Sequence, residues 1–306
     1  MPKPIYVEAM IRGSMDRVWE LTQSPDLHRR WDLRFTDIDY LPRPDPALPQ
    51  RFLYATRIGL GLDIRGHGET VGGGVGADGS RSSALKFWSA DPKSLIHTGA
   101  GYWKYVPVDG GLRFLTGYGY DVRFGAAGRA FDRWVFRPLM GWATAWSFDR
   151  LRIWVEQGIP PDVSLRRAVT HVLARGTVAF VWLYQGLVPK LVVRHADELS
   201  MIRAAGLSAA GARWTCLAAG IAEVTLGLVL LLTWRARWPL WVTVVAMPVA
   251  LAAVATTAPR FLVAAFNPVS LNLATAALAV IALLGGGDVP SASRCLRRPP
   301  TGTEGA

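Results

Sequence analysis

The sequence predicts an α+β domain, with a curved antiparallel sheet and a long C-terminal helix, followed by an all-α four-helix transmembrane bundle. Strand-like alternation of apolar and polar residues recurs through the first part of the chain, and a Trp-rich helical stretch follows it. Further on, residues 238–259 and 261–287 contain no charged side chain and are separated only by Arg260. About 20 apolar residues are enough for a helix to cross a bilayer.

The first part begins with a strand and two short helices. Residues 5–12 alternate between apolar and polar side chains, which predicts a half-buried strand. Ser14 is then expected to cap a helix that carries Val18, Trp19 and Leu21, and a second short helix covers residues 26–31.

Six further strands and one long helix complete this part. The expected strands are residues 34–41, 51–58, 62–71, 82–89, 94–106 and 112–124. Turn residues separate them, including Gly72–Gly74, Asp78-Gly79 and Asp109–Gly111. The helix is expected over residues 128–157, with a break or kink at Pro138, which lacks a backbone donor.

This order resembles the helix-grip fold of the START-like polyketide cyclase/lipid-transport (SRPBCC) superfamily. The residues that carry the resemblance are the strand 5–12, the segment Ser14–Leu21 and the segment Pro25–Asp32. The resemblance implies a space between sheet and long helix that holds a hydrophobic molecule, such as a lipid, a quinone or a polyketide-like compound. The interrupted helix departs from the family pattern.

The tryptophans of the long helix have two interpretations. Trp134, Trp142, Trp146 and Trp154 either pack on the sheet or rest on the membrane surface, where indole rings are favoured and neighbouring arginines meet lipid phosphates. The sequence leaves both open.

Four membrane spans are expected, over residues 176–193, 214–233, 238–258 and 266–284. Residues 161–306 carry 13 basic and 6 acidic residues, mostly in the connections between these spans. This placement is typical of membrane flanks and argues against a nucleic-acid partner.

The distribution of charge also predicts orientation. Eight basic residues flank the spans on the side of the amino end and five flank them on the other side, which favours cytoplasmic termini. We therefore expect a multi-pass protein of the cell inner membrane. Residues 1–160 would form the cytoplasmic domain, residues 168–287 the bundle and residues 288–306 a disordered tail.

The second part resembles the DoxX-like family of four-helix membrane proteins. The resemblance rests on four segments: Phe180–Lys190, Asp197–Leu199, Gly220–Val224 and Asn267–Asn272. It implies location and architecture rather than a reaction, although some relatives are linked to quinone-coupled sulfur oxidation or oxidative stress.

Four polar residues of the predicted bundle are candidate functional residues. Glu223 is a carboxylate in the middle of a span, and such groups are costly in lipid unless they are paired. Lys190 is its expected partner, with Arg175 next, in either a proton-handling or a structural pair. Asn267 is expected to cap the fourth span, and Asn272 to donate a hydrogen bond between helices.

In the first domain, the candidate polar residues of a cavity are His28, His67 and Glu69. His28 lies one helical turn before Asp32, and His67 and Glu69 share one side of a strand. The chain contains no nucleotide or hydrolase motif in its required context and only two cysteines. We therefore expect no metal, no cofactor and no catalytic residue.

These observations favour membrane-anchored binding or handling of a hydrophobic ligand, without intrinsic catalysis. The alternatives are a quinone-associated redox subunit with Glu223 handling protons, and a structural protein that recruits partners. The expected partners are membrane lipids and a hydrophobic small molecule. A homo-oligomer and a subunit of a membrane complex both remain open.

Overall fold

The computed structural model describes residues 3–45, 47–59 and 61–300, and they form two compact units. Of these described residues, those up to residue 164 and those from residue 290 form the first unit, and residues 165–289 form the second.

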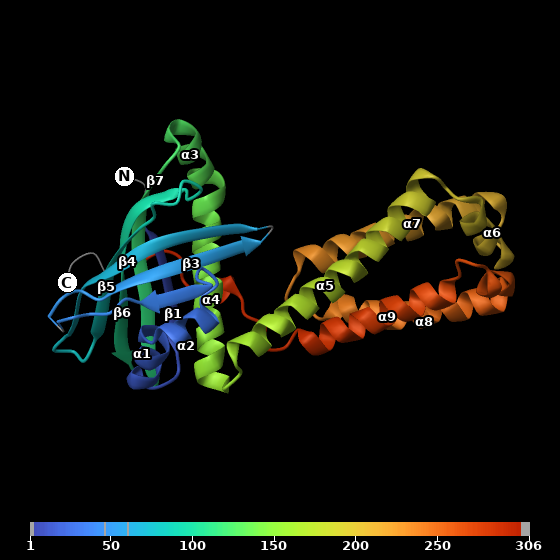
Figure 1. The fold of residues 1–306 in the computed structure, drawn as a ribbon. Coiled ribbons are helices and arrows are strands. Elements are labelled where there is room, and N and C mark those ends of the chain that lie inside the picture. Colours follow the sequence, from blue (N-terminus) through green and yellow to red (C-terminus); the bar gives the residue numbers. More distant parts are fainter. Residues whose placement is uncertain (1–2, 46, 60, 301–306) are drawn as a thin grey trace. The chain divides into compact units, whose positions relative to one another are not determined.

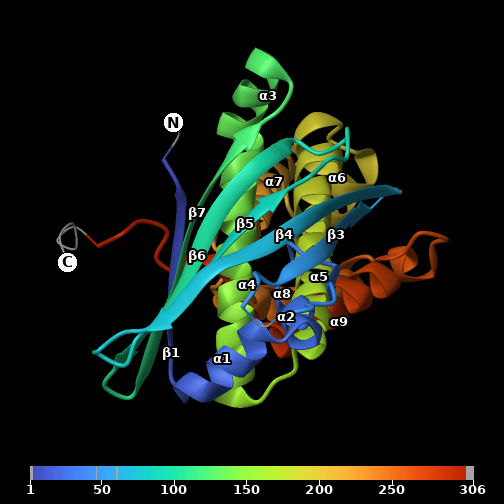
Figure 2. The same ribbon diagram turned by 60° about the vertical axis from the view of Figure 1, so that its left-hand side comes forward.

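A seven-stranded antiparallel sheet forms most of the first unit, in the order β1-β7-β6-β5-β4-β3-β2. The strands are β1 (Ile5–Ile11), β2 (Asp37–Tyr40), β3 (Arg51–Gly59), β4 (Leu62–Val75), β5 (Arg81–Trp88), β6 (Ile96–Val108) and β7 (Gly111–Val122). The two short helices α1 (Met15–Gln23) and α2 (Pro25–Trp31) connect β1 to β2. Figure 2 shows the sheet curving around the long helix α4 (Arg137–Gln157), as the helix-grip fold requires. The predicted fold of this part is confirmed.

Local sequence explains how these helices begin. The Ser14 side chain accepts a hydrogen bond from the Arg17 backbone N–H at 3.3 Å and caps α1, as predicted. Before α4 the chain forms α3 (Gly125–Phe131) and a π-helical stretch, η1 (Asp132–Phe136). Pro138 occupies the first turn of α4, where its missing N–H is tolerated.

Aromatic side chains fill the core between sheet and α4. Trp31, Trp103, Phe114 and Phe148 are buried, and the Phe114 and Phe148 rings stack with centroids 4.4 Å apart. Of the α4 tryptophans, Trp146 is buried. Trp142 remains 43% exposed, so the helix has both an inward and an outward tryptophan.

Two sequence expectations are corrected in this unit. Gly72–Gly74 belong to β4, which continues to Val75, and the turn is made by the residues around Gly79 at φ +75°. Of the disordered tail expected over residues 288–306, residues 290–300 are instead part of the first unit, and residues 301–306 lie outside the described residues. The short 3₁₀ helix η4 (Ala292–Arg294) packs against α4, and Leu296 pairs with Glu8 at the edge of β1.

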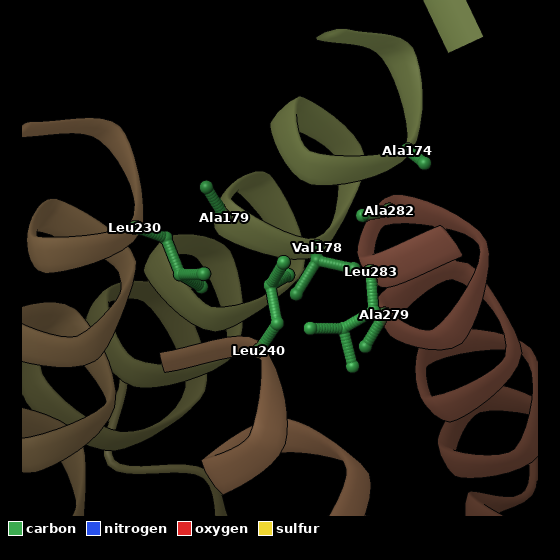
Figure 3. Close-up of a cluster of buried hydrophobic side chains, with 8 residues drawn as sticks. All are labelled: Ala174, Val178, Ala179, Leu230, Leu240, Ala279, Ala282 and Leu283. Carbon is green, nitrogen blue, oxygen red and sulfur yellow. The ribbon is translucent and has the colours of Figure 1, made fainter. Parts of the chain in front are cut away.

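The second unit is helical. Its helices are α5 (Pro161–Gln185), which begins in the first unit, η2 (Gly186–Val192), α6 (Ala196–Ala204), α7 (Ala209–Leu232), α8 (Trp238–Thr257), η3 (Pro259–Val263) and α9 (Pro268–Gly285) (Figure 1). By length and composition α7, α8 and α9 can each cross a membrane, and α5 with η2 and α6, taken together as one span bent by 92°, is a fourth candidate. Small and branched apolar side chains of α5, α7, α8 and α9 meet in its core, where Val178 and Ala279 are fully buried (Figure 3).

Candidate functional site

A buried charged cluster lies in the interior of the first unit, formed by His28, Asp32 and Arg34. The Asp32 side chain is fully buried, and it follows the last residue of α2. Its carboxylate accepts two hydrogen bonds from the Arg34 guanidinium, from Nε at 2.9 Å and from Nη2 at 2.6 Å. His28 Nε2 lies 3.1 Å from Asp32 Oδ2. We call these three residues the Asp32 cluster.

Electrostatics keeps this carboxyl ionised. Burial alone would raise the pKa of Asp32, but the positive charge of Arg34 and the hydrogen bond with His28 outweigh burial. They hold the pKa of Asp32 well below its usual range. The same pairing raises the pKa of Arg34 above its usual value, although burial opposes it. The cluster is therefore a stable ion pair at neutral pH.

Aromatic rings surround the cluster. The Arg34 guanidinium lies 5.5 Å from the centroid of Phe35 and 5.4 Å from that of Tyr118. The His28 ring packs edge-on against Trp103, with centroids 4.9 Å apart. The Tyr118 hydroxyl is within 2.8 Å of the Thr144 hydroxyl, which ties this end of the sheet to α4. A charged group is thus set into an otherwise aromatic interior.

Beyond the cluster, the inner face of the sheet is only partly covered. Phe35, Tyr54 and Phe87 are half-buried, and we call these three residues the inner aromatic face. The rings of Tyr54 and Phe87 lie close to the sheet because glycines stand opposite them: a Cβ on Gly66 would overlap the Tyr54 ring, and a Cβ on Gly99 would overlap the Phe87 ring. This face offers apolar surface beside the Asp32 cluster.

The three predicted cavity residues do not lie on the same side of the sheet. His28 faces the interior of the unit, against Asp32 and Trp103. His67 and Glu69 share one side of β4, but it is the outer side, because Gly66 and Gly68 between them face inward and are buried. His67 is exposed and stacks on Trp88, and Glu69 pairs with Arg51. The expectation that these two residues line the cavity is corrected.

The second unit contains its own charged cluster, formed by Lys190, Glu198 and Glu223. Lys190 Nζ lies 3.0 Å from Glu223 Oε2 and 3.5 Å from Glu198 Oε1. The first contact has the distance of an ion pair without the angles of a hydrogen bond. Close backbone approach makes it feasible, because a Cβ on Gly186 would lie 2.7 Å from the Gly220 carbonyl oxygen. The predicted pairing of Glu223 with Lys190 is present.

The remaining polar residues of the second unit stabilise helix ends and helix contacts. Asn267 caps α9 by accepting from the Ser270 N–H at 3.0 Å, as predicted. Asn272 donates to the Met247 carbonyl on α8 at 3.4 Å. Arg175 does not contact Glu223. Its guanidinium donates to three carbonyls at the end of α7 and in the connection that follows it, those of Leu230, Thr233 and Ala236.

Among the described residues, no group of three or more His, Cys, Asp or Glu side chains is placed to hold a metal ion. Sequence reasoning missed Arg34. The only feature of the sequence that relates Arg34 to the cluster is its position two residues after Asp32. Arg34 lies in an irregular connection, and the sequence pattern does not predict the conformation of this connection.

Comparison with known proteins relates both units to other chains. Residues 179–280 match the family model described as DoxX-like family. The uncharacterized membrane protein YndG of Bacillus subtilis (strain 168) is 43% identical over 237 residues, which cover 77% of this chain and 80% of that protein.

Solved structures were compared as well. TTHA0849 from Thermus thermophilus has a TM-score of 0.33 at 15% identity, covering 45% of this chain and 86% of its own. The STAR-related lipid transfer protein from Xanthomonas axonopodis has a TM-score of 0.37 at 14% identity, covering 49% and 84%. The di-domain ARO/CYC StfQ of the steffimycin pathway has a TM-score of 0.38 at 15% identity, covering 51% and 52%. On the strength of the YndG similarity and the family match, the chain belongs to the family of YndG, a family of membrane proteins, and its second unit carries a DoxX-like domain.

Proposed function

We propose that this protein binds a hydrophobic molecule in its helix-grip unit and holds that unit at the membrane through its DoxX-like unit. The observation that carries the proposal is the Asp32 cluster beside the inner aromatic face. A guanidinium has five N–H donors, and Asp32 takes two of those of Arg34. The ligand would place its apolar body on the aromatic rings and one oxygen acceptor near Arg34.

The fixed orientation of Arg34 supports this role. Asp32 and the two flanking rings restrain the guanidinium, so little further entropy is lost when a ligand binds it. A carbonyl, carboxylate or phenol oxygen would match its remaining donors. A lipid, a quinone or a polyketide-like compound each carries such an oxygen. Membrane anchoring suits this ligand class, because apolar molecules concentrate in lipid.

The proposal includes a topology. The residues that precede α5 and those that follow Val289 belong to one folded unit, so both ends of the second unit leave the membrane on the same side. An even number of crossings is then required. Among the described residues three helices qualify alone, and the proposal assigns the fourth crossing to the bent α5–η2–α6 segment. The excess of basic residues at the ends of the spans favours the cytoplasm for that side.

Extraction of the bound molecule tests the binding role. Full-length protein purified in mild detergent is extracted with organic solvent, and the extract is analysed by mass spectrometry. The wild type should yield one compound class near stoichiometry, and Arg34→Gln should lose it. Arg51→Gln removes an arginine from the outer face and should keep it.

Because Arg34→Gln leaves Asp32 unpaired, the double variant Asp32→Asn/Arg34→Gln is included as a neutral pair. It should fold and still lose the ligand. Equal retention of the compound by the wild type and a folded double variant would contradict the proposal.

A further inference from the structure

A second candidate binding site lies in the DoxX-like unit, where a pocket of about 580 Å³ opens beside the start of α7. The residues that line the pocket come from η2, from the residues that follow η2, and from α6 and α7. They are Lys190, Arg194, Leu199, Ala210, Arg213, Trp214, Cys216 and Leu217. Three of them are cationic and none is acidic, so the wall is a basic surface.

The two carboxylates nearby do not cancel this charge. Glu198 and Glu223 both approach the Lys190 ammonium and are not lining residues, so they fix that side chain in place. Arg194 and Arg213 behave differently. Within the described part of the chain, neither has a carboxylate oxygen within ion-pair distance. Both guanidinium groups are therefore available to an anion.

Backbone dipoles add to the positive potential. Helix α7 is 24 residues long and begins at Ala209, after its cap Ser208. Ala210 lies in its first turn, so the positive end of the helix dipole is at the pocket. Arg194 has φ +54°, a left-handed conformation that is rare for a residue with a side chain. The N-terminal end of α7 and the arginines therefore both favour a negatively charged ligand.

The remaining wall of the pocket is apolar. Leu199 and Leu217 line it, and Trp214 is 71% exposed beside them. A free inorganic anion would gain nothing from these side chains. A ligand with an anionic head and a hydrocarbon tail would use both the arginines and the apolar wall, and the pocket lies at the end of membrane helices, where lipid headgroups are found.

We propose that this pocket binds an anionic membrane phospholipid, with its phosphate between Arg194 and Arg213 and its acyl chain along Leu199, Trp214 and Leu217. The inference is independent of the ligand proposed for the helix-grip unit, because no residue is shared between the two sites. Failure of one therefore leaves the other standing.

Native mass spectrometry of the full-length protein in detergent tests the assignment. The probes are phosphatidylglycerol, phosphatidylcholine and inorganic phosphate. Charge-assisted hydrogen bonds are the strong ones, so each arginine should contribute roughly tenfold in affinity. Arg194→Gln/Arg213→Gln should weaken phosphatidylglycerol binding about a hundredfold. Both side chains are exposed, so the variant should keep its fold and melting temperature.

Arg203→Gln is the matched control, since it removes an exposed cation from the end of α6 that does not line the pocket. It should bind phosphatidylglycerol as the wild type does. Equal binding by the wild type and the double variant would overturn the proposal. Displacement of phosphatidylglycerol by equimolar inorganic phosphate would also overturn it, by assigning the site to a free anion. Equal affinity for phosphatidylcholine would overturn the requirement for net negative charge.

Discussion

Leu296 and Glu8 exchange two backbone hydrogen bonds, each 2.9 Å long, although they stand at opposite ends of the chain. The pairing continues the edge of β1 with a residue that follows the last membrane helix. Asp149 of α4 reinforces it, because its buried carboxylate accepts from the Ser291 N–H at 2.7 Å and from Arg294 at 3.1 Å. The C-terminal segment is thus part of the helix-grip unit.

Asp149→Asn should release this segment. The substitution removes the charge that faces Arg152 and Arg294, and breaking a buried ion pair costs about 3 kcal/mol. Trypsin should then cut after Arg294 and Arg297 much faster than in the wild type, as followed by mass spectrometry. Asp109→Asn, at an exposed turn, is the control. Unchanged cleavage in Asp149→Asn would mean that Asp149 does not hold the segment.

Arg34→Met should destabilise the helix-grip unit in a pH-dependent way. In the wild type the pKa of Asp32 is depressed in the folded state, so its contribution is present above the ordinary carboxyl pKa and is lost only as pH falls through the folded value. Without Arg34, burial favours the protonated form. The loss should be about 3–5 kcal/mol at pH 7 and smaller near pH 4.

Thermal unfolding followed by near-ultraviolet circular dichroism checks this pH dependence. Arg51→Met should change stability little at either pH, because the Arg51–Glu69 pair is on the surface and the arginine is 69% exposed. A loss in Arg34→Met that is equal at pH 7 and pH 4 would show that the charge of Asp32 is not its cause.

Glu223→Gln should cost the membrane unit about 1–2 kcal/mol, because Lys190 keeps only the more distant Glu198. Lys190→Met should cost a similar amount. The double variant should cost less than the sum, since neither charge is then left unpaired. The melting temperatures of the wild type, the two single variants and the double variant in detergent measure this coupling between the two side chains. A Glu223→Gln variant with wild-type stability that loses a quinone-linked activity would instead favour the proton-handling interpretation.

The proposed topology predicts a reporter pattern. A reporter that is active only outside the cytoplasm should be silent when it is fused after Ala306. It should be active when it is inserted at Gly206, in the connection between α6 and α7. Activity at both positions would exclude an even number of crossings with cytoplasmic ends.

Much of the architecture follows from local pattern. Alternation over residues 5–12, the Ser14 cap and the uncharged segments predicted their elements because each is set by nearby residues. Which side of β4 faces the core could not be predicted in this way. A period of two places His67 and Glu69 on one side, but which side is buried depends on where α4 packs.

The residues that the sequence did not reveal are those whose role depends on the shape of an irregular connection or on partners far away in the chain. Arg34 meets Asp32 through an irregular connection, and Arg175 meets carbonyls that lie 55 to 61 positions away. Leu296 has a partner at the other end of the chain. The glycines Gly72–Gly74 were expected to form a turn. They continue the strand instead, because they pair with β5.

Photo-crosslinking locates the proposed ligand in the full-length protein. A hydrophobic diazirine probe with one carboxylate is added to the full-length protein in membranes, irradiated and mapped by peptide mass spectrometry. We predict adducts on Phe35, Tyr54 and Phe87 that disappear in the Asp32→Asn/Arg34→Gln variant. Adducts confined to α7, α8 and α9, with none on the inner aromatic face, would contradict it.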